Sequence, residues 1–205
     1  GPSYAVTTVA SWTEYVWNEA TGSSDAIPHS TTRLESVPGD LGACGTGGGV
    51  NKANEWTPIP EDGIGLTGVS VYTPNGVASA TNVLVVDAMP PGLSFAGFHI
   101  RSPAEFSFYA CTFAGKIGED VTYTYFNDHL GDCTLIPSYY APTPSGMIEL
   151  THLVGYAATW GGGAEPLQPF VMGYQTYAPD GWLADHPWQG DPPAPPRNTA
   201  FAKLD

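Results

Sequence analysis

Two glutamates are the residues with which this chain could hydrolyse a substrate. Glu105 and Glu149 each lie within or beside a segment rich in aromatic or aliphatic residues. Glycoside hydrolysis needs two carboxyl groups about 5 to 9 Å apart, and neighbouring strands of a sheet can supply them. His99, Arg101 and His152 could complete the polar floor of such a site. Isolated carboxylates are common at strand edges, however. No motif places two glutamates on one strand. A glycoside hydrolase or lyase is therefore ranked below the binding and structural hypotheses given at the end of this section.

The other segments of chemical interest do not match known catalytic or metal-binding patterns. The sequence has no G-x-S-x-G nucleophile elbow, and its glycine-rich run at 45–49 lacks the G-K-[ST] ending of a phosphate-binding loop. Residues 127–132 gather Asn, Asp and Gly as a calcium loop would, but without the EF-hand spacing, and the same residues form ordinary turns. We therefore expect no cofactor and no metal, and the sequence favours a non-catalytic protein.

Turn residues place several of the six tryptophans and eleven tyrosines in loops. A flat ring in a loop can stack on the apolar face of a sugar while neighbouring polar groups bind the sugar hydroxyls. For any single tryptophan, a ring that folds back as a lid over an open end of the core is the favoured alternative. The predicted ligand-binding residues are Trp56, Tyr139, Tyr140, Trp160, Asp180, Trp182, His186 and Trp188.

The chain is strongly acidic. Six Lys and Arg oppose twenty Asp and Glu, which gives a formal net charge of -14 and a pI near 4.4. Nucleic-acid phosphates and anionic membranes would repel such a chain, and solubility is the ordinary role of the same charge. No run of about 18 apolar residues predicts a transmembrane helix. The leading Gly1-Pro2 is typical of the remnant of a cleaved tag, so we expect the native N-terminus and any export signal to lie outside this sequence.

The 25 glycines and 20 prolines are spread so evenly that almost no stretch is long enough for a three-turn helix. Alternating, β-branched and aromatic segments between turns predict an all-β fold, an antiparallel β-sandwich of jelly-roll type with long loops. We expect a single sandwich domain over residues 1–190 and a Pro-rich extended arm over residues 191–205. The predicted strands are Tyr4 to Val9, Ile64 to Tyr72, Asn82 to Asp87, Phe95 to Arg101, Glu105 to Phe113, Val121 to Phe126, Met147 to Val154 and Gln168 to Tyr177.

Two segments are harder to assign. Residues 11–18 begin with a capping box, but Thr13, Tyr15 and Trp17 alternate as in a strand, and a strand is favoured. Residues 21–60 are dense in Gly, Ser, Pro and Thr, which predicts a long functional or mobile loop. Strands that the pattern does not reveal are at least as good an interpretation of this second segment.

The three cysteines, Cys44, Cys111 and Cys133, contain no C-x-x-C pair, so neither a zinc site nor a redox dithiol is indicated. A Cys111–Cys133 bridge is the most economical pairing. It would close a loop of roughly 20 residues and stabilise the fold by about 3 kcal/mol. Three buried thiols are an equally good interpretation.

In composition and in the placement of its tryptophans, the chain resembles secreted carbohydrate-binding modules and the jelly-roll receptor-binding domains of phage-like particles, although it shares no motif with them. The resemblance implies an extracellular or particle-surface module that binds a glycan or a cell-surface receptor. The close alternative is a structural subunit of a virion-like particle or cell envelope, joined into a homo-oligomer or larger assembly through the C-terminal arm. We expect no nucleic-acid partner and no membrane insertion.

Overall fold

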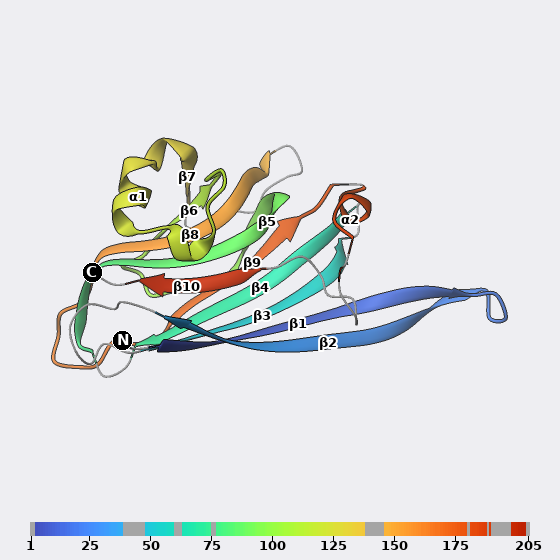
Figure 1. Ribbon diagram of the computed structural model, residues 1–205, viewed down its shortest axis with the longest axis horizontal. Helices are drawn as coiled ribbons and strands as arrows, with labels where there is room; N and C mark the ends of the chain where they lie inside the picture. Colours follow the sequence, from blue (N-terminus) through green and yellow to red (C-terminus); the bar gives the residue numbers. More distant parts are fainter. Residues whose placement is uncertain are drawn as a thin grey trace.

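The computed structural model describes residues 3–38, 48–59, 63–74, 77–137, 146–179, 181–187, 189 and 198–203, and these are mostly β-strand (Figure 1). The longest helix among them has six residues, in agreement with the helix-poor fold predicted from the sequence. The strands are β1 (Ser3–Asn18), β2 (Ser23–Pro38), β3 (Gly48–Ile59), β4 (Gly63–Pro74), β5 (Ser79–Ser102), β6 (Ser107–Cys111), β7 (Cys133–Ile136), β8 (Ile148–Gly161), β9 (Phe170–Tyr177) and β10 (Thr199–Lys203). The helical elements are η1 (Gly118–Asp120), α1 (Tyr123–Asp128), η2 (Leu130–Asp132) and α2 (Trp182–Asp185).

The ten strands form one continuous sheet that folds over on itself into two packed layers (Figure 1). The first layer has the order β2-β1-β3-β4-β9, and the second contains β8, β6 and β7. Strand β5 joins the layers, and β10 pairs with β5 outside this order. Of the described pairs, β1 and β3 run parallel and the others antiparallel. The predicted all-β sandwich is therefore confirmed, while its jelly-roll connectivity stays a prediction.

Strand β5 has 24 residues because it serves both layers. Its first half pairs with β8 on one edge and β10 on the other, and its second half pairs with β9. The register with β8 shifts between Ala88 and Leu93. Within that shift, Pro90 and Pro91 have no amide hydrogen for a ladder, and Gly92 has a φ of 86°. The Pro90-Pro91-Gly92 segment, whose composition is typical of a turn, is therefore an irregularity inside one long strand.

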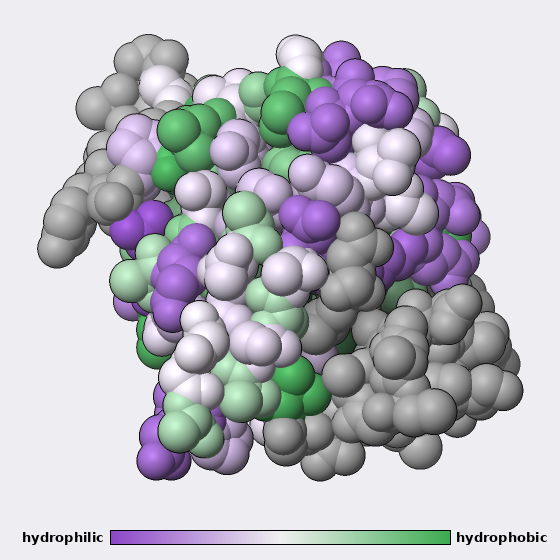
Figure 2. Space-filling model, turned by 90° about the vertical axis from the view of Figure 1, so that its left-hand side faces the viewer, coloured by the Kyte–Doolittle hydropathy of each residue, from purple (hydrophilic) through white to green (hydrophobic). Residues whose placement is uncertain are grey.

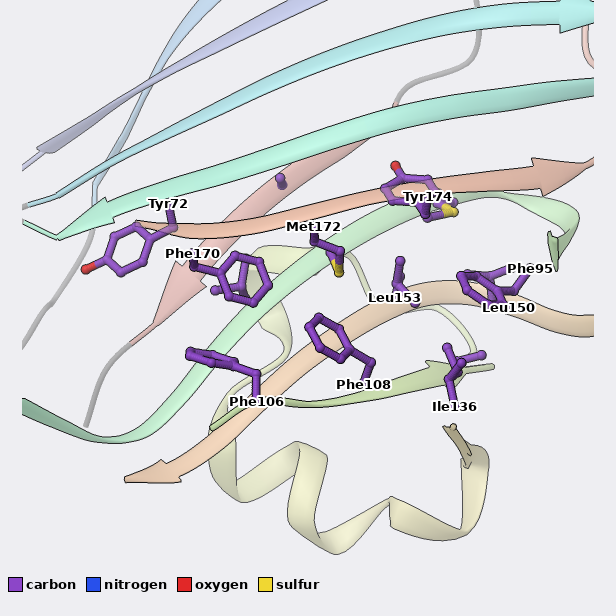
Figure 3. Packing of buried hydrophobic residues seen from close by; sticks show 14 of the residues in the cluster. Tyr72, Phe95, Phe106, Phe108, Ile136, Leu150, Leu153, Phe170, Met172 and Tyr174 are labelled. Carbon is purple, nitrogen blue, oxygen red and sulfur yellow. The ribbon is translucent and has the colours of Figure 1, made fainter. Parts of the chain in front are cut away.

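Apolar side chains from both layers meet in the main core (Figure 3). Phe170 and Met172 of β9 face Phe106 and Phe108 from the β6 side of the second layer. The ring centroids of Phe106 and Phe170 are 4.7 Å apart, and those of Phe108 and Phe170 are 6.0 Å apart. Tilted aromatic pairs at such distances contribute about 0.5–1.5 kcal/mol beyond the burial of their surface, so these rings are a main source of attraction between the layers.

A smaller apolar cluster lies on the outer face of the second layer, where α1 covers it. Leu84 and Val86 of β5 contribute to this cluster together with Phe126 of α1, because alternate residues of a strand point to opposite faces. A disulfide between Cys111 and Cys133 joins β6 to β7 at the same place. The predicted cysteine pairing is therefore confirmed, and Cys44 lies outside the described residues.

The strand expected at Val121 to Phe126 is wrong, because residues 123–128 form α1. Thr122 is the extended N-cap residue, and its hydroxyl accepts a hydrogen bond from the Tyr125 amide at 3.1 Å. This cap satisfies one of the free amide groups of the first helical turn. The strand prediction rested on the alternation of Thr and Tyr and did not consider Thr122 as a helix N-cap.

For residues 21–60, the alternative of strands that the pattern does not reveal is confirmed wherever the structure describes them, because β2 and β3 occupy most of that stretch. The long loop expected there is wrong. Strand β2 lies at the edge of the sheet, where a proline such as Pro28 is tolerated because its nitrogen can face solvent. The strand favoured over residues 11–18 is confirmed as part of β1. Strand β2 was not predicted from the sequence because it is rich in polar residues. Such residues are expected in a hairpin that largely faces water.

The arm expected at residues 191–205 is corrected by β10. Residues 191–197 lie outside the described residues, but Thr199–Lys203 pair antiparallel with β5. Ala200 is fully buried, and Lys203 donates a hydrogen bond to the Glu119 carbonyl of η1. Residues 199–203 therefore belong to the sheet and not to an extended arm. Five residues are enough to form a short strand beside β5.

Replacing Cys111 and Cys133 together by serine should lower the free energy of unfolding by about 3 kcal/mol, because a chain segment of 22 residues regains freedom in the unfolded state. Denaturant unfolding of the two proteins measures the difference. Non-reducing peptide mapping of the wild type should recover the Cys111–Cys133 peptide with Cys44 alkylated. Equal unfolding midpoints for variant and wild type would show that the bridge adds no stability.

Candidate functional site

Trp160 lies in the core and not in an exposed loop. It stands near the end of β8, its side chain is 2% exposed, and its ring packs against Tyr72 at 6.0 Å and Phe106 at 5.2 Å between centroids. The glycine run that predicted a loop begins only at the last residue of the strand. A sugar cannot reach this ring in the folded protein, and Trp160 is a core residue of β8.

Trp182 is also a buried structural residue, with 4% exposure. Its indole N–H donates a hydrogen bond to the Pro91 carbonyl at 2.9 Å. A Cβ atom on Gly92 would lie 2.9 Å from that indole nitrogen, so the glycine makes room for the ring. His186 stacks on the other side, with ring centroids 4.2 Å apart. Trp182 therefore covers the irregular segment of β5 and is not presented to a ligand.

Most of the remaining predicted ligand-binding residues have side chains outside the described part of the chain. Trp56 belongs to β3 by its backbone, and its side chain lies outside the described part of the chain. Residues Tyr139, Tyr140, Asp180 and Trp188 also lie outside the described residues. Of the residues predicted around the C-terminal loop, the structure describes Trp182 and His186, and His186 is half-buried against Trp182.

The two glutamates of the hydrolase hypothesis lie at opposite ends of the second layer. Both are exposed, Glu105 in the turn before β6 and Glu149 near the start of β8. Ser107 of β6 pairs with Tyr156, so Glu105 lies beyond the Tyr156 position of β8. The stretch of strand from Tyr156 to Glu149 spans about 23 Å at the usual rise per residue. Carboxyl pairs of glycosidases lie within about 10 Å of each other, so these two residues cannot act together.

Among the described residues, no group of three or more His, Cys, Asp and Glu side chains is placed to hold a metal ion. The segment considered as a calcium loop, residues 127–132, forms the end of α1 and the turn η2. His129 contacts the Tyr125 carbonyl through Nδ1 at 2.8 Å. These residues therefore have a local structural role in closing the helix.

The two exposed aromatic side chains of the described part are Tyr15 and Trp17 of β1, with 56% and 62% exposure. Trp12 of the same strand is buried in the main core, and alternate residues point to opposite faces. Tyr15 and Trp17 therefore lie on the face turned away from the core. The strand register sets uncharged residues of β2 beside them. We call this surface the aromatic face; it consists of Thr13, Tyr15, Trp17, Ser24, Ala26 and Pro28.

The aromatic face lies on a hairpin that extends beyond the rest of the sandwich (Figure 1). The parallel pairing of β1 with β3 ends at Trp12 and Trp56, and beyond that point β2 is the only described strand paired with β1. We call residues 13–28 the projecting hairpin. A two-stranded ribbon alone in water is marginally stable, so contact with another molecule would stabilise this part of the fold.

The tip of the projecting hairpin is held by local hydrogen bonds. The Gly22 amide donates to the Asn18 carbonyl at 2.9 Å, and Gly22 has a φ of 65° that suits glycine. The Asn18 side chain donates to the Asp25 carboxylate at 2.8 Å. At the base, His29 pairs with Glu14 at 2.7 Å and stacks on Trp12. The ribbon is thus ordered at both ends while its aromatic face stays open.

The opposite end of the sandwich presents a different surface. On the face shown in Figure 2, apolar residues form small separate groups with hydrophilic residues between them. Contiguous apolar surface, not scattered apolar residues, marks an interaction site. The coloured residues of this face therefore offer no counterpart to the aromatic face of the hairpin.

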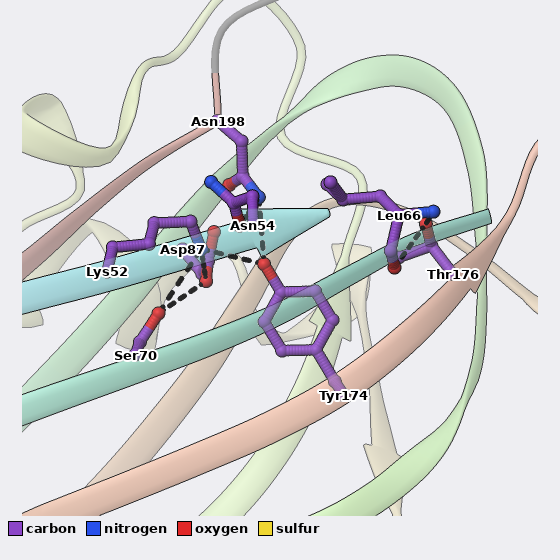
Figure 4. A network of polar contacts seen from close by, with 8 residues as sticks. All are labelled: Lys52, Asn54, Leu66, Ser70, Asp87, Tyr174, Thr176 and Asn198. Atoms are coloured by element: carbon purple, nitrogen blue, oxygen red, sulfur yellow. Dashed lines mark hydrogen bonds and ion pairs between the residues drawn. The ribbon is translucent and has the colours of Figure 1, made fainter. Parts of the chain in front are cut away.

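A cluster of polar and charged side chains lies buried between the layers (Figure 4). Lys52 of β3 and Asp87 of β5 are in direct contact, and both side chains are fully buried. Ser70 of β4 accepts a hydrogen bond from Lys52 at 3.2 Å and donates one to the Asp87 carboxylate at 2.7 Å. The Tyr174 hydroxyl accepts from Lys52 at 2.7 Å and from the Asn198 amide at 2.9 Å. We call these five residues the inner polar cluster.

Burial governs the protonation of the groups in and near the inner polar cluster. Desolvation lowers the pKa of Lys52, against the charge and hydrogen bond of Asp87, which raise it. Desolvation, with a further contribution from the Asp87 charge, raises the pKa of Tyr174 well above its ordinary value. Desolvation also lowers the pKa of His152 to about 4, while the Asp87 charge and the Lys116 backbone oppose that shift. The interior therefore favours the uncharged forms of all three side chains.

Comparison with known proteins gives no relative: no family model, no curated protein and no solved structure matches the chain. Among the described residues there is no helix long and apolar enough to cross a membrane. The functional argument therefore rests on the chain's own residues.

Sequence reasoning placed Tyr15 and Trp17 on one face of a strand but did not identify them as a surface, because nothing in the sequence shows that the pairing of β1 with β3 ends at Trp12. The inner polar cluster was missed entirely. Asp87 carried a usable signal, since it is a single charge after the apolar run Val83 to Val86, and a charge at a core position normally has a partner. Lys52 carried none, because it alternates with polar neighbours.

His152 should make the protein less stable as the pH falls below neutral. The native imidazole binds a proton only near pH 4, whereas an unfolded one does so near pH 6.5. Protons therefore bind the unfolded chain first, and the free energy of unfolding should fall by about 3 kcal/mol between these two pH values. Stability is retained in full above pH 6.5.

Denaturant unfolding of the wild type and of His152→Gln, measured from pH 7.5 to 4, tests this expectation. The variant should lose most of the difference that the wild type shows, while the matched variant His186→Gln keeps it. An equal fall in wild type and His152→Gln would assign the pH dependence to other groups.

Proposed function

We propose that the protein is a non-catalytic, surface-displayed binding module that contacts a neutral carbohydrate through the aromatic face of its projecting hairpin. The observation that carries this proposal is the exposure of Tyr15 and Trp17, 56% and 62%, side by side on a ribbon that no described third strand supports. Isolated exposed apolar residues are common, but paired aromatic rings on a projecting element mark an interaction surface.

The chemistry of the aromatic face favours a neutral, hydroxyl-rich ligand. Neighbouring residues on one face of a strand are about 7 Å apart, so the rings of Tyr15 and Trp17 lie at a spacing over which adjacent sugar residues can stack. Thr13 and Ser24 add hydroxyl groups beside the rings. No charged residue belongs to this face, and the net charge of -14 disfavours anionic ligands.

The location on a cell or particle surface is part of the proposal. The Cys111–Cys133 disulfide supports it, because disulfides form and persist in oxidising compartments. The hydrolase alternative relied on Glu105 and Glu149, and these two carboxyl groups lie too far apart to act as its pair.

A structural subunit is the second candidate, and the free edge of β2 favours it. Strand β2 ends the sheet order, and β1 is the only described strand that pairs with it, so its outer edge could pair with a neighbouring chain. In this case the projecting hairpin, not the C-terminal segment, joins the copies. Light scattering should then show an oligomer that dissociates on dilution, and substitution of Trp17 by alanine should shift it to the monomer. A monomer at all concentrations would exclude the structural role.

Glycan-array binding of the wild type and of Trp17→Ala and Tyr15→Ala tests the carbohydrate proposal. Each substitution should weaken binding by about 1 kcal/mol or more, roughly fivefold, because an aromatic contact surface is lost. The melting temperature should change little, since both side chains are exposed. Val16→Ala is the matched control, because Val16 is an exposed apolar residue of the same strand on the opposite face. Binding that survives both aromatic substitutions would refute the assignment.

A further inference from the structure

The contact between Lys52 and Asp87 places an amine beside a carboxyl group in the interior of the protein. The two residues are 35 positions apart in sequence and lie in different layers of the sandwich. Both side chains have no exposure to solvent. Within the described residues this is the only pair of oppositely charged side chains that is fully buried. It does not take part in the proposed carbohydrate contact, which lies on the projecting hairpin.

A buried ion pair of this kind is costly in its charged form. Removing an ammonium and a carboxylate from water costs several kcal/mol for each ion, and only part of that cost is offset by their attraction. Transfer of one proton from the Lys52 ammonium to the Asp87 carboxylate leaves a neutral amine and a carboxylic acid. A desolvated neutral lysine is a nucleophile. The same burial that disfavours the ions therefore produces a reactive pair.

Ser70 is placed to move the protons that a reaction between these groups requires. Its hydroxyl accepts a hydrogen bond from Lys52 Nζ and donates one to Asp87 Oδ2. It thus links the attacking nitrogen to the carboxyl oxygen that would leave. Tyr174 holds the amine from the other side through its hydroxyl at 2.7 Å. A Cβ atom on Gly68 would overlap that hydroxyl, so the glycine in β4 allows Tyr174 to reach the cluster.

We infer that Lys52 and Asp87 condense into an intramolecular amide, an isopeptide cross-link between the two layers. The Nζ–Cγ bond forms and the Cγ–Oδ2 bond breaks. One proton leaves Nζ for Ser70, and the Ser70 hydroxyl proton passes to Oδ2, which departs as water with the carboxylic acid proton. One amine and one carboxylic acid give one amide and one water, and no oxidant or other reactant is needed.

Two physical effects favour the condensation. The fold holds the reacting groups together, and such placement is equivalent to effective concentrations of about 10⁵ to 10⁸ M. The product also removes both ionisable groups from the apolar interior and replaces them with a neutral amide. The amide N–H keeps hydrogen-bonding partners nearby, because Ser70 and Tyr174 surround the Lys52 nitrogen.

Asn198 and Asn54 are the competing acyl groups. The Asn198 amide donates to the Asn54 side-chain oxygen at 2.9 Å and to Tyr174, so both amides lie close to the reaction site. Neither has a hydrogen bond to Lys52 among the described contacts, whereas Asp87 contacts it directly. Condensation with an asparagine would release ammonia instead of water, which mass spectrometry separates.

Intact mass spectrometry of the full chain with its disulfide reduced tests the inference. The wild type should have a mass about 18 Da below that of its sequence, the mass of one water. Digestion should yield a branched peptide that joins Lys52 to Asp87, and trypsin should not cleave after Lys52. Lys52→Arg keeps a charged partner for Asp87 but cannot form the amide, so it should show the full mass. Lys116→Arg is the matched control and should keep the loss of water.

Ser70→Ala measures the proton relay separately from the cross-link. When each chain is isolated unfolded, before the amide has formed, and is then folded by removal of denaturant, the loss of water should proceed at least about tenfold more slowly in this variant than in the wild type, because a positioned acid-base group is gone. An unmodified mass in folded wild type after prolonged incubation would overturn the inference. A loss of about 17 Da with a branch to Asn198 or Asn54 would overturn the assignment of Asp87. These results do not depend on the carbohydrate assay.

Discussion

The structure depends on one constraint: a single strand, β5, has to serve both layers of the sandwich. Its hydrogen-bonding edge passes from β10 to β9 along its length, and the change of partner coincides with the Pro90, Pro91 and Gly92 segment. Backbone groups at such a transition must still find partners, because unpaired buried groups are costly. The indole of Trp182 supplies one of these partners by donating to Pro91. The helix α2 is therefore held to the sheet by the hydrogen bond between Trp182 and the irregular segment of β5.

The folding-over of the sheet also creates the inner polar cluster. Strands β3 and β5 are separated by β4 and β9 in the sheet order, so Lys52 and Asp87 meet only because the layers face each other. A slip of β3 by one residue would turn Lys52 outward and leave Asp87 buried without its cation. An unpaired buried charge is strongly destabilising. The cluster therefore specifies how the layers are aligned, whether its two central groups are joined by an ion pair or by an amide bond.

The elements that could be predicted from the sequence and those that could not differ for physical reasons. The strands around Val69, Val85 and Met172 were predictable because their residues are apolar or β-branched and are bounded by turns. Strand β2 was not, because an edge strand with one face in water needs no apolar pattern. The helix α1 was misassigned because a local cap at Thr122 outweighed the strand preference of its tyrosines.

The aromatic residues considered as binding sites were also predicted only in part. Trp160 and Trp182 were expected in loops because glycine and proline stand beside them, but those breakers end strands or bend them while the rings remain in the core. Tyr15 and Trp17 were predicted to share one face of a strand, and they do. Their exposure could not be predicted, because it depends on where β3 stops pairing with β1. That property belongs to the tertiary structure and has no signature within the hairpin itself.

The projecting hairpin has a mechanical consequence. A pull on its tip along the strand axis is carried by β1 to its parallel pairing with β3, which extends from Val6 to Trp12. The hydrogen bonds of that ladder are then loaded together in shear, and none is peeled apart before the others. The next element in the load path is Lys52 of β3, whose link to Asp87 passes the force to the other layer. Rupture under force is governed by the unfolding rate. The β1–β3 ladder and the Lys52–Asp87 link would therefore transmit tension from the hairpin to both layers of the sandwich.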